Sequence, residues 1–150
     1  MSDPGALEFM KSSRHRLNQI CQQYGIHILY AFGSQSKKIR ELVEGQRSIS
    51  RLSSSDVDIG VKAKSGERLS VAAKVNLALA LEDLLGCERV DLVSLSEADP
   101  FLAAEVIRGE RLFARDEYEA DEYELFILRR AGDLAPLERE RMALILGEST

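Results

Sequence analysis

Two carboxylates, Asp56 and Asp58, lie two residues apart in an otherwise apolar stretch that ends at Val61. In a β-strand, residues i and i+2 point to the same face and lie about 6.5–7 Å apart along the chain. Ionised carboxylates are costly on a buried strand unless a cation or an opposite charge compensates them. Since hard divalent cations prefer oxygen ligands, the pair indicates a metal site.

Three apolar runs predict the strands that would position these acids. Residues 26–32 are almost continuously apolar, which is typical of a strand covered on both faces. Residues 56–63 predict a second strand, with its three β-branched residues on the face opposite the acids. Residues 89–95 predict a third strand, which carries a single acid, Asp91. Each predicted strand therefore brings a feature that could contribute to one site.

In most of the remaining chain, apolar residues recur at the spacing of a helix. Helices are expected at residues 6–24, 35–44, 69–85 and 99–109, and a charged periodic segment runs from 120 to 146. Pro136 should break that last segment into two helices. Residues 112–114 form a short apolar patch that no predicted element includes. The pattern predicts an α/β (α+β) chain with a helical C-terminus.

Gly33 and Ser34 stand where the first predicted strand meets the next helix. Backbone N–H groups and the positive end of a helix dipole attract phosphate at such a junction. Glycine lets a ligand approach the backbone closely, and the serine hydroxyl can donate to a phosphate oxygen. A plain tight turn would have the same sequence, so both interpretations stay open.

The length and net charge of the chain favour some classes of protein over others. A chain of 150 residues fits one domain with a sizeable core. The formal net charge of −5 argues against a general nucleic-acid binder, which would normally show a basic stripe. No apolar run approaches the roughly 20 residues that span a bilayer, and the N-terminus lacks a signal-peptide pattern. We therefore expect no membrane association and a cytoplasmic location.

Four stretches together resemble a known family. They are Ala31–Ser34, Ser55–Val61, Val90–Val93 and Ile107–Phe113. This set resembles the nucleotidyltransferase superfamily of DNA polymerase beta, and within it the minimal nucleotidyltransferases (MNT) that act as MntA-like antitoxins in HEPN/MNT toxin–antitoxin pairs. The resemblance covers about residues 20–115. It implies a single nucleotidyltransferase domain over 1–150, with C-terminal helices at about 116–147 and a small mixed β-sheet of three or more strands flanked by helices.

The resemblance also implies a role for each motif residue. Asp56 and Asp58 would bind two Mg²⁺ ions, and Asp91 would bind the catalytic one and help to activate the acceptor hydroxyl. These three acids would be the catalytic residues. Gly33 and Ser34 would bind the β- and γ-phosphates of the nucleotide.

The implied reaction is the transfer of AMP from ATP to a hydroxyl. In HEPN/MNT pairs the acceptor is a tyrosine of the HEPN toxin, a ribonuclease, so this chain would be the antitoxin. Two alternatives stay open. One is a nucleotidyltransferase acting on a small molecule such as an aminoglycoside, and the other is a binding module that neutralises a partner without catalysis. Three unrelated acids near strand ends would also explain the pattern.

The chain departs from the family between Gly33-Ser34 and the first aspartate. The segment from Gln35 to Ser55 is longer than usual, and the arginine that often follows Gly-Ser is absent. Residues 45–55 are rich in serine and predict a loop, either solvated or folded over a triphosphate. A longer surface loop costs little free energy, but it could also reshape the phosphate or acceptor pocket.

Overall fold

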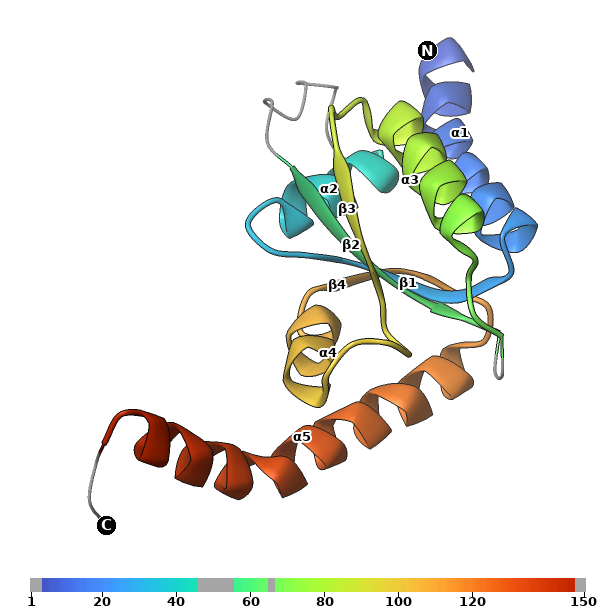
Figure 1. Ribbon diagram of the computed structural model, residues 1–150. Helices are drawn as coiled ribbons and strands as arrows, with labels where there is room; N and C mark the ends of the chain where they lie inside the picture. Colours follow the sequence, from blue (N-terminus) through green and yellow to red (C-terminus); the bar gives the residue numbers. More distant parts are fainter. Residues whose placement is uncertain (1–3, 46–55, 65–66, 148–150) are drawn as a thin grey trace.

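The computed structural model describes residues 4–45, 56–64 and 67–147 (Figure 1). Helices and strands alternate through most of the chain. In order, they are α1 (Pro4–Gln23), β1 (Ile26–Phe32), α2 (Ser36–Val43), β2 (Val57–Ala63), α3 (Val71–Leu85), β3 (Val90–Ser94), α4 (Pro100–Ile107), β4 (Glu110–Ala114) and α5 (Glu117–Ile145). The three predicted strands and the predicted α/β class are confirmed.

The strands form one mixed sheet in the order β3-β2-β1-β4. β1 pairs antiparallel with both β2 and β4, whereas β2 and β3 run parallel. β4 contains the apolar patch at 112–114 that the sequence left without an element. Only Leu112 in this strand is fully buried, so its alternation is too short to predict a strand from sequence alone.

Strand β1 is buried at all seven positions because helices cover both faces of the sheet. Leu29 and Ala31 belong to a core with residues of α1, α2 and α3. Ile28, Tyr30 and Phe32 point the other way and pack with residues of α4 and α5. The two groups of helices lie on opposite sides of the sheet in Figure 1. A strand with no exposed face explains the continuous apolar run at 26–32.

The predicted break at Pro136 is wrong, because α5 continues through it from Glu117 to Ile145. A proline inside a helix removes one backbone hydrogen bond and crowds the carbonyl four residues earlier, at Gly132. The turns on either side retain their own hydrogen bonds, so a penalty of about 3 kcal/mol need not end the helix. Within the described residues, neither α5 nor any other helix is both long and apolar enough to cross a membrane.

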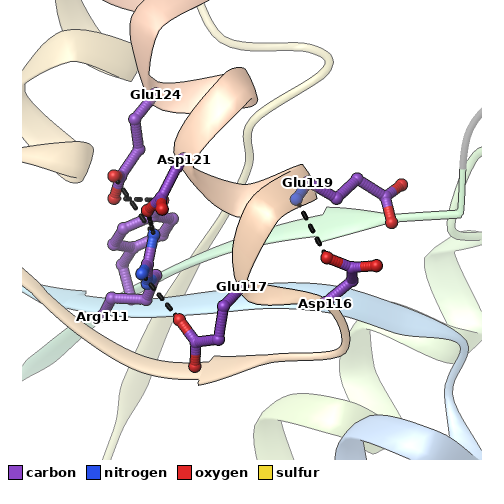
Figure 2. A network of polar contacts seen from close by, with 7 residues as sticks. Arg111, Asp116, Glu117, Glu119, Asp121 and Glu124 are labelled. Atoms are coloured by element: carbon purple, nitrogen blue, oxygen red, sulfur yellow. Dashed lines mark hydrogen bonds and ion pairs between the residues drawn. The ribbon is translucent and has the colours of Figure 1, made fainter.

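An ionic network fixes the first turns of α5 to the sheet (Figure 2). The guanidinium of Arg111, on β4, contacts Glu117 at 2.7 Å, Asp121 at 2.9 Å and Glu124 at 3.2 Å. The hydroxyl of Tyr30 donates to the other carboxylate oxygen of Glu124 at 2.8 Å. Burial and this hydrogen bond raise the pKa of Tyr30 well above its ordinary value. The network thus joins β1, β4 and α5 through one carboxylate.

Removing the Tyr30 hydroxyl should weaken this junction. We expect Tyr30→Phe to lower the free energy of unfolding by about 1.5–3 kcal/mol, the usual range for a hydrogen bond to a charged group. Urea denaturation followed by circular dichroism measures the change. Tyr118→Phe is the matched control, because Tyr118 is 73% exposed. Equal stability of the two variants would contradict a stabilising role for the Tyr30–Glu124 bond.

Candidate active site

Asp58 and Asp91 lie side by side on parallel strands. Asp58 of β2 is the register partner of Asp91 of β3, and it also pairs with Phe32, the last residue of β1. Residues in register on neighbouring strands point to the same face of a sheet. Gly60, two residues beyond Asp58, faces α4, so both acids lie on the α4 side. The fold therefore brings together two of the three acids that the sequence singled out.

The carboxylate of Asp58 sits in an unfavourable electrostatic environment. Burial raises its pKa above the ordinary value, and repulsion from Asp91, Asp56 and Glu105 raises the pKa further. Each of these effects disfavours the ionised form. A divalent cation would reverse the penalty, because it would turn mutual repulsion into shared attraction. The set of carboxylate oxygens also matches the ligands that Mg²⁺ prefers.

The other two predicted acids differ from each other in exposure. Asp56 precedes β2 and is exposed, and the half-buried Asp91 forms an ion pair with Arg89 at 3.0 Å. In the part of the chain that the structure describes, no three His, Cys, Asp or Glu side chains are grouped closely enough to hold a metal ion. Arg89 contacts one of the two carboxylate oxygens of Asp91. Coordination by all three acids therefore stays a prediction.

Gly33 touches the Asp58 carboxylate directly. Its φ of 78° lies in the left-handed region, which an L side chain rarely adopts. A Cβ added at this position would lie 2.6 Å from Oδ2 of Asp58. The turn after β1 thus places bare backbone against the acid, and only glycine satisfies both constraints.

Ser34 follows on the exposed side of the same turn, and α2 begins two residues later at Ser36. The Ser36 N–H donates to the carbonyl of Gly33 at 3.3 Å, which tightens the entry into the helix. The N-terminus of α2 therefore lies next to the Gly33–Asp58 contact. Oriented N–H groups at such a position favour an anion.

Two further charged residues, Glu105 and Arg89, lie next to the acids and were not among the predicted site residues. Glu105 is exposed on α4 and is close enough to Asp58 to raise its pKa. Helix α4 packs tightly on β2, since a Cβ added to Gly60 would lie 2.3 Å from Val106 Cγ1. One signal for Glu105 was available, because it is the only charged residue in α4. A signal for Arg89 was available too, because it stands two residues before Asp91 in the predicted strand 89–95, and residues i and i+2 of a strand share a face.

Most of the serine-rich segment lies outside the described residues, which resume at Asp56. Its two interpretations, a solvated loop or a cover for a triphosphate, therefore stay predictions. The structure does describe the first part of the segment between Ser34 and Asp56, which forms α2. Ile39 and Val43 of this helix are fully buried in the core with α1 and α3. The first part of this segment thus forms a packed helix.

The chain resembles known proteins in its family and in its fold. The family model described as "Polymerase beta, Nucleotidyltransferase" matches residues 15–118. No curated protein matches the chain. The family match includes all five residues that the sequence singled out.

Solved structures share the fold over most of the chain. A chain of "the toxin-antitoxin with AMP-PNP" is 26% identical, with 88% of this chain and 94% of that chain covered and a TM-score of 0.59. A mutant of "the toxin-antitoxin MntA-HpeT" is 25% identical, with coverages of 87% and 93% and a TM-score of 0.58. A chain of the complex of "tri-AMPylated Shewanella oneidensis HEPN toxin" with MNT antitoxin is 24% identical, with coverages of 91% and 95% and a TM-score of 0.59, and shares the fold.

Two glycines test the contact between backbone and carboxylate. Gly33→Ala should destabilise the chain by more than Gly25→Ala. Both residues have positive φ, which costs an L residue about 1–2 kcal/mol, but only Gly33 lies against another side chain. Gly25 has nothing within 4 Å of an added Cβ. Urea midpoints of the two variants give the difference, and equal midpoints would show that the Asp58 contact imposes no constraint.

The raised pKa of Asp58 predicts that neutralising it stabilises the metal-free protein. A carboxyl whose pKa is higher in the folded state makes its ionised form unfavourable to folding at neutral pH. Asp58→Asn should therefore raise the unfolding midpoint in EDTA at neutral pH. This increase in the midpoint should become smaller as the pH falls from the raised pKa of Asp58 towards the ordinary pKa of an aspartate. Over that range the Asp58 carboxyl of the unmodified chain also becomes neutral.

The control for this experiment is Asp133→Asn, which removes an exposed carboxylate from α5. Its unfolding midpoint in EDTA should stay close to that of the unmodified chain at neutral pH. A lower midpoint for Asp58→Asn at neutral pH would contradict the repulsion between the acids.

Proposed function

This chain belongs to the polymerase beta nucleotidyltransferase family, and from that premise we propose that it transfers AMP from ATP to a partner protein. The proposed acceptor is a tyrosine hydroxyl of a HEPN toxin, so the chain would act as the antitoxin of the pair. The proposal includes Mg²⁺ as cofactor, ATP and the toxin as partners, and the cytoplasm as location.

The observation that supports this proposal most strongly is the pairing of Asp58 with Asp91 beside Gly33. Two acids in register on parallel strands repel each other, and a bound cation or proton would relieve that repulsion. The adjacent turn offers backbone and a helix N-terminus, which suit a phosphate. Nucleotidyl transfer requires carboxylates that hold metal ions and, beside them, a site that binds phosphate.

Asp56, Asp58 and Asp91 would hold the metal. When bound, Mg²⁺ neutralises charge on the triphosphate and lowers the pKa of an attacking hydroxyl. Gly33 would let a phosphate approach the backbone, and Ser34 would donate a hydrogen bond to it. Arg89 contacts one oxygen of Asp91 at 3.0 Å, so a metal would bind the other oxygen or displace Arg89.

ATP and a toxin are proposed because of the related structures. The chain that is 26% identical belongs to a toxin–antitoxin complex with AMP-PNP, an ATP analogue, and the chain that is 25% identical belongs to MntA-HpeT. Each match covers at least 93% of the related chain, so the likeness extends beyond a shared core. The net charge of −5 agrees with a protein rather than a nucleic acid as acceptor.

Transfer of label tests the proposal. The chain, a HEPN toxin from the neighbouring gene, α-labelled ATP and Mg²⁺ should together give a labelled toxin, and mass spectrometry should place AMP on tyrosine. Asp58→Asn and Asp91→Asn should each reduce labelling by more than about 100-fold, because even outer-shell groups of a metal site cost 10–100-fold when changed. Asp56→Asn should also reduce it.

Asp133→Asn serves as the control and should label the toxin as the unmodified chain does. Toxin neutralised without any label, and equally well by Asp58→Asn, would replace the proposal with a binding module. Label that goes to an aminoglycoside but not to the toxin would replace it with a small-molecule transferase. Mg²⁺ should also raise the unfolding midpoint of the native chain but not that of Asp58→Asn.

A further inference from the structure

A cavity lies on the sheet face that carries Asp58, at the opposite end of β2. Lys62 shares that face with Asp58, because it stands four residues later, about 13 Å further along the strand. Between them α4 covers the strand, since a Cβ added to Gly60 would lie 2.3 Å from Val106 Cγ1. The cavity has a volume of about 280 Å³ and is lined by β2, α4, α5 and the segment after β3. It is therefore separate from the candidate active site.

The floor of this cavity is apolar and belongs to the core between the sheet, α4 and α5. Leu95, Ala103 and Ile127 are buried there, each with at most 4% of its surface exposed. Tyr123 and Phe126 of α5 also line the cavity, with ring centroids 6.4 Å apart. A lining of aromatic and aliphatic side chains suits the apolar part of a ligand.

Three cations line the same cavity: Lys62, Lys64 and Arg130. Within residues 4–45, 56–64 and 67–147, none of them forms an ion pair with a carboxylate. Lys62 is half-buried, and its ammonium lies 5.2 Å from the centre of the Tyr123 ring. It donates a long hydrogen bond of 3.4 Å to the carbonyl of Ala63. A cation that is partly removed from water without an opposite charge favours a bound anion.

The acids near the cavity leave these cations uncompensated. Glu97 and Asp99 flank Ala98 of the lining, but Glu97 pairs with Lys74 at 2.7 Å, and Asp99 accepts hydrogen bonds from the first turn of α4. Glu67 is the one acid among the described residues that line the cavity, and it is exposed. The lining therefore has an excess of positive charge in a chain whose formal net charge is −5.

We propose that this cavity binds a small aromatic anion. The ring would lie against Tyr123 and Phe126, and the charged group would lie among Lys62, Lys64 and Arg130. Each of these cations can donate to an oxygen of a phosphate or a carboxylate. Pockets for drug-sized ligands usually have volumes of about 300–1,000 Å³, so a cavity of about 280 Å³ fits a molecule with one ring and one charged group.

Three probes test the aromatic and the anionic part separately. Phenyl phosphate has a ring and a charge, phenol has the ring alone, and inorganic phosphate has the charge alone. Isothermal titration calorimetry of the full chain should give a dissociation constant of about 1 mM or lower for phenyl phosphate. Phenol and inorganic phosphate should each bind at least about tenfold more weakly, because each lacks one set of contacts.

Benzoate is compared with phenyl phosphate, since aromatic carboxylates and aryl phosphates share the proposed chemistry. The tighter of the two identifies the class of anion. All titrations are made in EDTA without ATP or a toxin, so their outcome is independent of the proposed function.

Two neighbouring arginines give a matched pair of variants. Arg130 lines the cavity, whereas Arg129 is exposed and points about 100° away around α5. Arg130→Gln should weaken the binding of phenyl phosphate by about tenfold, and Lys62→Gln should have a similar effect. Arg129→Gln should leave the binding unchanged.

The aromatic contact is tested with Phe126→Ala, because Phe126 is 55% exposed and its removal should leave the fold intact. This variant should bind phenyl phosphate more weakly and inorganic phosphate as before. Circular dichroism checks that each variant keeps its helix content.

Phenyl phosphate that fails to bind at millimolar concentrations would overturn the proposal. Phenyl phosphate that binds no more tightly than inorganic phosphate would also overturn it. So would binding that Arg130→Gln and Arg129→Gln weaken equally, because the anion would then lie outside this cavity.

Discussion

The close approach of Gly33 to Asp58 is the constraint around which the candidate site is built. A strand buried on both faces ends at Phe32, and the chain must turn at once with a positive φ to enter α2. That turn leaves no room for a side chain between its backbone and the carboxylate. The mixed sheet then brings Asp91 beside Asp58 on the next strand. One turn and one strand pairing therefore decide where the two acids meet the backbone that we propose as a phosphate site.

The ionised Asp58 carboxylate lowers the stability of the folded chain. Asp58 has a raised pKa because burial and three neighbouring acids all oppose its ionised form. The rest of the molecule offsets this cost with two cores, one on each face of the sheet, and with the Arg111 network that anchors α5. Strained or repelling groups of this kind persist only where the surrounding fold holds them in place, and they are typical of functional sites.

Sequence patterns predicted the elements that have strong periodicity. The strand at 26–32 has the bounds of β1, and the second strand starts within one residue of β2. The fourth strand was not predicted, because its alternation is short and largely half-buried. The break at Pro136 was wrong, since a helix can lose one hydrogen bond and continue. Glu105 was missed because its approach to Asp58 depends on how closely α4 packs against Gly60.

By itself, the sequence determined which residues could perform the chemistry: three acids on or next to apolar strands and a Gly-Ser turn after the first strand. These are local signals, because residue type and spacing along one element set them. Only the tertiary structure decided that Asp58 and Asp91 share a register and that Gly33 touches Asp58. Those contacts join segments far apart in the chain, and strand order and helix packing fix them in ways that no local pattern encodes.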